Sequence, residues 1–205
     1  MCPKPETANG FTSKGVYGSF LSHLNILKEA MHDGVESVWI LEDDAIFRSN
    51  FAANQEEVAA YLSGNDWDFC YIGHTLASEL ANLAHGLIPF SGPFFWAHCY
   101  AVHRRVLPRL VDYLEETLIN PPGHPRGGKV YIDAAYTLFR RLYPDVITLV
   151  SNPVLSVQRG SPSSLVNGRW YDHYTLTRPL VAICRKMRDE VWRRTGWPDT
   201  APELT

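Results

Sequence analysis

The chain has 205 residues, of which 45% are hydrophobic and 20% are charged, and its formal net charge is -3 at pH 7. These values fit one folded domain with a sizeable core and exclude a chain that is disordered over most of its length. The small negative charge excludes a protein that binds nucleic acid through an overall basic surface.

The cysteines and the N-terminal residues favour a cytoplasmic protein. Cys2, Cys70, Cys99 and Cys184 are scattered and lack the close spacing of a zinc or redox motif, so ordinary reduced thiols are the simplest interpretation. Residues 1–13 are predicted to be a tail without the apolar core of a signal peptide. No apolar run reaches the length that spans a membrane.

The first predicted element is a helix over residues 16–32, in which apolar side chains recur at helical spacing. Gly15 and Gly18 lie at its start, where the missing side chain lets another backbone or a phosphate approach the free N–H groups. Close helix packing explains the two glycines equally well. Ser22 and His23 follow, and because neighbouring positions on a helix do not face each other, a structural role is the simpler interpretation.

The next feature is a short apolar run, residues 38–41, that ends in Glu42, Asp43 and Asp44. The run predicts a buried strand, and ligand sites in open α/β sheets lie where such strands end. Three adjacent carboxylates repel one another, and Mg²⁺ or Mn²⁺ is the usual compensating ion for clustered oxygen ligands. A solvated acidic turn is the alternative interpretation.

A helix through residues 56–62 and a second buried strand over residues 69–72 complete a strand–helix–strand unit, which predicts a parallel sheet. Residues 75–93 are predicted to be a long irregular loop that forms the lip of an acceptor site. Residues 94–102 predict a third strand.

The second half predicts a strongly amphipathic helix over residues 107–118, a helix from Asp133 to about residue 141, a strand over residues 146–150 and a polar loop after Leu155. The carboxylate of Asp133 either caps its helix or faces a cleft as a base. Residues 180–194 predict a basic amphipathic helix, which either packs on its own domain or lies on an anionic membrane surface.

Taken together, these segments resemble glycosyltransferase family 25, which contains lipopolysaccharide galactosyltransferases and collagen galactosyltransferases. Residues 15–23 are similar to the family's Gly-x-x-Gly-x-x-x-Ser-His signature, and residues 41–44 resemble its Glu-Asp-Asp segment. Weaker similarity covers residues 98–102, residues 132–133, and a Pro-x-x-x-x-Gln-x-x-x-x-Ser spacing at Pro153, Gln158 and Ser163. The resemblance extends from about residue 14 to residue 164.

The resemblance implies one α/β domain of the GT-A type over residues 14–175, with a mostly parallel central sheet flanked by helices. Residues 176–205 are then a separate basic helix and tail. Family members usually begin with a strand and an Asn-Leu-Asp-Arg-like segment, so we expect the N-terminal βα unit to be missing or reduced here. Such a sheet exposes an edge that a partner subunit can cover, which would make the protein an oligomer.

The resemblance also implies an inverting transferase that moves a hexose, expected to be galactose, from a nucleotide-diphosphate sugar to a saccharide or glycoconjugate acceptor. Glu42, Asp43 and Asp44 then hold Mn²⁺ or Mg²⁺ against the diphosphate. Asp133 is the candidate base for the acceptor hydroxyl. The residues expected to line the substrate pocket are Gly18, Ser22, His23, Gln158 and Ser163.

Two other functions fit the same pattern. A non-catalytic relative would keep the fold and bind a sugar or a partner transferase. A metal-dependent phosphoesterase also uses clustered acids, but it needs further ligands from other strands, for which His74 and His98 are candidates.

Overall fold

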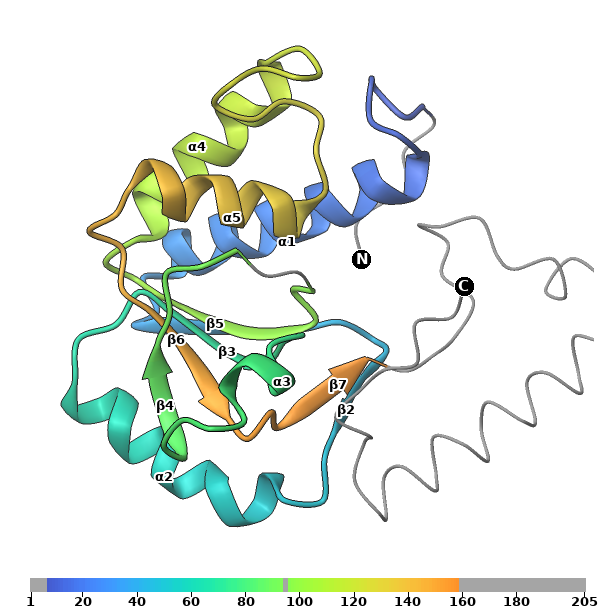
Figure 1. Ribbon diagram of the computed structural model, residues 1–205. Helices are drawn as coiled ribbons and strands as arrows, with labels where there is room; N and C mark the ends of the chain where they lie inside the picture. Colours follow the sequence, from blue (N-terminus) through green and yellow to red (C-terminus); the bar gives the residue numbers. More distant parts are fainter. Residues whose placement is uncertain (1–6, 94–95, 159–205) are drawn as a thin grey trace, which may run out of the picture.

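The structure, a computed structural model, describes residues 7–93 and 96–158. Helices lie on both faces of a seven-stranded sheet (Figure 1). The elements in chain order are α1 (Lys14–Asp33), β1 (Ser37–Leu41), β2 (Ala45–Phe47), α2 (Phe51–Gly64), β3 (Phe69–Gly73), α3 (Ala77–Leu80), β4 (Gly86–Pro89), β5 (Cys99–His103), α4 (Leu107–Ile119), α5 (Ile132–Leu142), β6 (Thr148–Asn152) and β7 (Ser156–Gln158).

Helix α1 has a defined start and a defined end. The Ser13 side chain accepts a hydrogen bond from the Val16 N–H at 3.1 Å, which satisfies a donor that has no partner within the helix. Gly34 ends the helix with a φ of 66°, a backbone conformation that glycine adopts without steric cost. Phe11, in the segment predicted as tail, is buried and packs against Tyr17.

The sheet is mixed, so the prediction of a mostly parallel sheet is wrong. Its strands follow the order β1-β5-β3-β6-β4, and β7 joins both β3 and β2. β3 is parallel to β6 and β7, whereas the pairs β1–β5, β3–β5, β4–β6 and β2–β7 are antiparallel. Because β5 is antiparallel to both of its neighbours, β1 and β3 still run in the same direction. The predicted strand–helix–strand unit therefore exists with an antiparallel strand between its two strands.

Alternate side chains of β3 divide the core into two layers. Phe69 and Tyr71 pack with residues of α1, α4 and α5 on one face of the sheet. Cys70 and Ile72 pack with residues of α2 on the other. All five residues of β3 are buried, as expected for a central strand covered on both faces (Figure 1).

Four segments differ from the sequence prediction. The structure has strands β2 and β7 at positions predicted to be non-strand, and β4 lies within the predicted loop of residues 75–93. β5 begins at Cys99 rather than at residue 94, because Trp96 has a positive φ of 73° that a strand residue does not adopt. β2, β4 and β7 have three or four residues each, too few for a hydrophobic period to be recognised.

His74, directly after β3, is held by the backbone through both ring nitrogens. Nε2 donates to the Ser151 carbonyl at 2.9 Å, and Nδ1 accepts from the Leu76 N–H at 3.2 Å. This arrangement requires a neutral ring, because a protonated Nδ1 has no lone pair to accept the second bond. Burial lowers the pKa of His74 to about 4, and the hydrogen bond to Ser151 opposes the shift.

We therefore expect His74 to make the protein less stable in mild acid. Below the ordinary histidine pKa of about 6.5 the unfolded state binds the proton more readily than the folded state, so stability falls as the pH drops from about 6.5 to about 4. The full loss from this one group is about 3 kcal/mol. Urea unfolding at a series of pH values should show a shallower fall for His74→Gln, and His85→Gln, in an exposed position, should keep the wild-type slope. Equal slopes for wild type and His74→Gln would refute this assignment.

Candidate functional site

A tight turn between β1 and β2 presents the acidic residues. The Glu42 N–H donates to the His98 carbonyl at 2.9 Å, and the Ala45 N–H donates back to the Glu42 carbonyl at 3.0 Å. Glu42 and Asp44 are half-buried, whereas Asp43 is exposed. The turn therefore directs the first and third carboxylates toward the protein and the middle one toward solvent.

Gln158 joins the two half-buried carboxylates. Its Nε2 donates to Asp44 Oδ2 at 2.8 Å and lies 3.4 Å from Glu42 Oε2. The pairing of β2 with β7 fixes this contact, because Ala45 and Gln158 are partners in the antiparallel register. Residues 116 positions apart in the chain thereby meet at one carboxylate pair.

Asp44 combines a raised pKa with an unpartnered oxygen. Burial raises the pKa of its carboxyl, the charges of Glu42 and Asp43 raise it further, and the hydrogen bond from Gln158 opposes the shift. Its Oδ1 is buried and has no hydrogen-bond partner. A buried, unpartnered carboxylate oxygen beside a second carboxylate is an arrangement that a bound cation would satisfy.

His23 connects the acidic pair to the core. Its Nε2 lies 3.3 Å from Glu42 Oε1, and its Nδ1 lies 2.7 Å from the Tyr100 hydroxyl, which is 2.7 Å from the Tyr136 hydroxyl. These residues come from α1, β5 and α5, and His23 is only 4% exposed. A neutral His23 that donates from Nε2 to Glu42 can accept from Tyr100 at Nδ1, so one ring orients a carboxylate and a buried hydroxyl pair.

Ser22 and Gly18 are joined by a hydrogen bond within α1. The Ser22 hydroxyl donates to the Gly18 carbonyl at 2.9 Å, one turn earlier in the helix. Because Ser22 and His23 are adjacent helical residues, their side chains point in different directions. Of these two residues, only His23 has a hydrogen bond to the acidic pair among the described residues.

Asp133 is the second residue of α5, after Tyr131 at the N-cap position, so it does not occupy the predicted cap position itself. Its Oδ1 accepts from the Ala134 N–H at 2.7 Å and its Oδ2 from the Trp96 N–H at 3.2 Å. Within residues 7–93 and 96–158, no hydrogen bond or ion pair joins Asp133 to Glu42 or Asp44.

Two buried tyrosines stack on each other beside His23. Burial raises the pKa of Tyr71, the charge of Arg140 opposes the shift, and the charge of Asp133 adds to it. Tyr71 in turn stacks on Tyr100 with ring centroids 5.3 Å apart. Burial also raises the pKa of Tyr100, and Glu42 contributes there.

Sequence reasoning missed two residues that support the site, Tyr100 and Tyr136. Tyr100 belongs to the segment 98–102 that resembles the family, and this was the available signal for it. Tyr136 shows no signal beyond its place on an apolar helix face. Ser163 and residues 180–194, which carry two further predictions, lie outside the described residues.

The donor atoms fit a hard divalent ion held partly by its substrate. In the described part of the chain, no three His, Cys, Asp or Glu side chains converge closely enough to hold a metal by themselves. Mg²⁺ is usually bound by one or two carboxylates together with substrate phosphates, and Mn²⁺ prefers the same oxygen ligands. Glu42 and Asp44 supply such a pair.

The phosphoesterase alternative loses one of its two candidate ligands. Both ring nitrogens of His74 already bind backbone groups. His98 donates from Nε2 to the Ser156 carbonyl at 3.2 Å, and its Nδ1 is buried without a partner. Among residues 7–93 and 96–158, neither histidine completes a group of three side chains that could hold a metal ion.

No helix among the described residues is long and apolar enough to cross a membrane. The fold is that of an α/β protein with an acidic turn at the end of an edge strand of its sheet. The family model for glycosyltransferase family 25, described as a lipopolysaccharide biosynthesis protein, matches residues 4–120. The chain belongs to glycosyltransferase family 25.

Similar proteins include both transferases and proteins named inactive. The human "inactive glycosyltransferase 25 family member 3" is 32% identical over 95 residues, which are 44% of this chain and 16% of that protein. The mouse protein of the same name is 28% identical over 95 residues, which are also 44% of this chain and 16% of that protein. Procollagen galactosyltransferase 1 of Danio rerio is 36% identical over 63 residues, which are 30% of this chain and 10% of that protein. The matches thus span about a sixth or less of these relatives.

Gly73 controls how β7 is held against β3. A Cβ at this position would lie 2.2 Å from His98 Nε2, the atom that donates to the Ser156 carbonyl. We expect Gly73→Ala to displace the buried His98 ring and lower the free energy of unfolding by about 1–3 kcal/mol, as overpacking does in other cores. Urea unfolding measures this loss. The matched control, Gly64→Ala at the end of α2, meets no atom within 4 Å, so a similar loss there would contradict the explanation.

Proposed function

We propose that this chain is a metal-dependent, inverting glycosyltransferase that moves a hexose from a nucleotide-diphosphate sugar to a saccharide or glycoconjugate acceptor. The observation that supports this most is the contact of Gln158 with both Glu42 and Asp44 beside His23. It unites residues from three separate segments that resemble the family. Galactose is the hexose we propose, from the resemblance and from the galactosyltransferase among the similar proteins.

Glu42 and Asp44, with Asp43 from the solvent side, are the residues that would hold Mn²⁺ or Mg²⁺. When bound, such an ion neutralises the charge that develops on the departing nucleotide diphosphate. Asp44 Oδ1 is the first candidate ligand atom for the ion, because it is buried and has no hydrogen-bond partner. Gln158 keeps the two carboxylates together and His23 orients Glu42 from the other side.

Asp133 is the proposed base for the acceptor hydroxyl. An inverting displacement needs this proton acceptor on the face of the sugar opposite the leaving group. Asp133 lies on a different element from the acidic turn, and two backbone N–H groups fix the direction of its carboxylate. We place the acceptor between these two regions, next to the residues 75–93 that the sequence assigns to its lip.

A second function, sugar or partner binding without catalysis, is supported by one observation. The human and mouse relatives are named inactive although they share the matched region with this chain. In that case the acidic turn would persist as part of the fold, and acceptor binding would not depend on a metal or a donor.

Asp44→Asn should separate these functions. The substitution keeps the shape of the side chain but removes the charge that a divalent ion needs, so we expect the gain in nucleoside-diphosphate affinity on adding Mn²⁺ to fall at least about tenfold. Isothermal titration with a panel of nucleoside diphosphates, with and without Mn²⁺, measures this gain. Asp112→Asn, an exposed acid on α4, is the matched control and should behave like wild type.

The other outcomes of this titration each point to another conclusion. Wild-type affinity that is equal with and without Mn²⁺ would contradict the metal role of the acidic turn. Binding of glycans without metal-dependent donor binding would favour the non-catalytic relative. Release of phosphate from a generic ester, without sugar transfer, would favour the phosphoesterase.

A further inference from the structure

An apolar groove lies beside α2 on the sheet face opposite α1. Helices α1, α4 and α5 contribute to the core on one face. On the other face of the sheet, α2 packs over β3 and β4 and only partly covers β1 and β5 (Figure 1). The groove between α2 and β1 has a volume of about 460 Å³. Its apolar walls include Trp39, Leu41, Phe47, Phe51, Val58 and Leu62.

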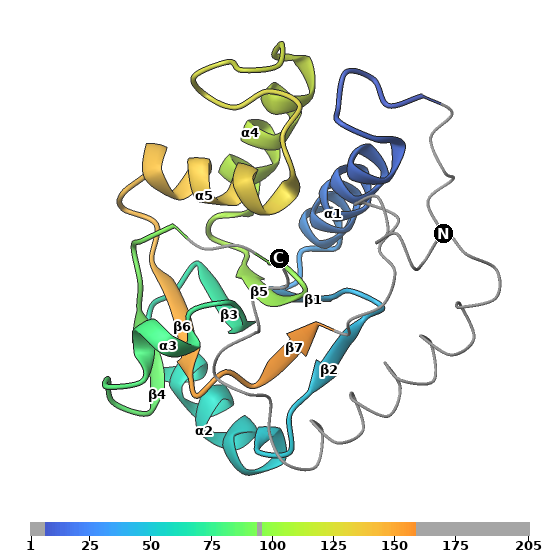
Figure 2. The same ribbon diagram turned by 45° about the vertical axis from the view of Figure 1, so that its right-hand side comes forward.

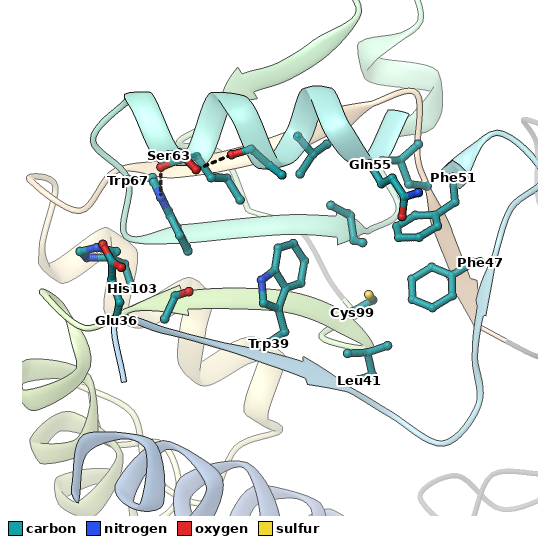
Figure 3. A pocket seen from close by; sticks show the side chains of 16 residues that line it. Glu36, Trp39, Leu41, Phe47, Phe51, Gln55, Ser63, Trp67, Cys99 and His103 are labelled. Atoms are coloured by element: carbon teal, nitrogen blue, oxygen red, sulfur yellow. Dashed lines mark hydrogen bonds between the residues drawn. The ribbon is translucent and has the colours of Figure 1, made fainter. Parts of the chain in front are cut away.

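Large apolar side chains remain exposed at the opening of this groove. Trp39 and Leu41 are two residues apart on β1, so both side chains point to the α2 side of the sheet (Figure 3). Phe47 lies beside Phe51. Their exposed fractions are 41% for Trp39, 48% for Leu41 and 39% for Phe47. A cluster of such residues on a sheet face normally packs against another element. The groove is therefore an apolar surface that another element can cover.

We propose that residues 180–194 of the same chain dock in this groove as an amphipathic helix. These residues lie outside the described part of the chain, and their sequence carries the argument. Leu180, Ile183, Cys184, Met187 and Val191 recur at the three- and four-residue spacing that places them on one helical face. Helices with this pattern bind apolar grooves through successive anchor residues on that face.

The length and starting point of the remaining chain suit this occupant. The last described strand, β7, ends at Gln158 and lies beside β2 (Figure 2). Phe47 of β2 lines the groove. Residues 159–179 then connect to the proposed helix, and a chain of this length can span at most about 70 Å. A 15-residue helix is about 22 Å long, comparable to the roughly 17 Å of a five-residue strand such as β1.

Charge also favours this occupant. By count of Lys and Arg against Asp and Glu, residues 1–158 carry a formal charge of -6 and residues 159–205 carry +3, which together give the -3 of the whole chain. Residues 180–194 alone carry +3. Glu36 lines one end of the groove, and the turn of Glu42 to Asp44 lies between Leu41 and Phe47. A basic helix in the groove would bring opposite charges together at its rim.

Crosslinking of Cys184 tests the proposal directly. In the full chain with Cys2→Ser, single substitutions Trp39→Cys, Leu41→Cys and Phe47→Cys place a thiol at three points along the groove, so no single register is assumed. Treatment with a short bismaleimide should give an intramolecular link in at least one variant, detected by peptide mass mapping and lost with Cys184→Ser. Ile119→Cys, an equally apolar but 84% exposed position on α4, is the matched control and should give no link.

A second measurement does not depend on the crosslink. Val191→Asp places a charge on the apolar face of the proposed helix, so we expect it to release the helix and increase the fluorescence of an apolar dye bound by the protein. Asp189→Lys, a charge change on the opposite side of the same helix that keeps the segment basic, should leave the dye signal closer to wild type.

Three outcomes would overturn the proposal. Links between chains rather than within one chain would assign the groove to a second copy. Absence of any link, with binding of residues 180–194 to vesicles that contain phosphatidylserine, would assign the segment to a membrane surface. Equal dye binding by wild type and Val191→Asp, with no link in any groove variant, would leave the groove open in the free protein.

Discussion

The pairing of β2 with β7 is the constraint on which the candidate site depends. It brings Gln158 to Asp44 and Glu42, and it has only three pairs of residues to do so. β7 is also held by β3 at one end, through the pairing of Gly73 with Ser156 and the hydrogen bond from His98 to Ser156. The buried centre of the sheet thus fixes where β7 lies. Gln158 of β7 in turn fixes where the carboxylates of Glu42 and Asp44 lie.

The carboxylates are held in an electrostatically unfavourable position. Burial and two like charges raise the pKa of Asp44, and one amide donor offsets this only in part, since Asp44 Oδ1 stays unpartnered. Perturbed and incompletely paired groups concentrate at functional sites, where a ligand supplies what the fold does not. The buried set of His23, Tyr100 and Tyr136 then keeps Glu42 in place from the core side.

Sequence patterns predicted the long or strongly periodic elements well and the short ones poorly. Helices α1 and α4 and the buried strand β3 follow from the spacing of their apolar residues. β2 and β7 could not be predicted, because three residues carry no period and their stability comes from each other across more than a hundred positions. The parallel sheet was predicted from the β1–α2–β3 order, and β5 enters between these strands by a connection that local patterns do not encode. The meeting of His23, Glu42 and Gln158 was suggested by the family resemblance alone, since nothing in their spacing places them together.

The groove beside α2 borders the same turn. Leu41 and Phe47, which flank the three acids in sequence, both line it, so an element docked there would restrain the turn from the outside. The central claim concerns the turn itself, and an anomalous difference map from crystals grown with Mn²⁺ and a nucleoside diphosphate tests it most directly. The account predicts one manganese peak bonded to Asp44 Oδ1 and to the diphosphate. A bound diphosphate with manganese elsewhere, or with Asp44 still hydrogen-bonded only to Gln158, would contradict it.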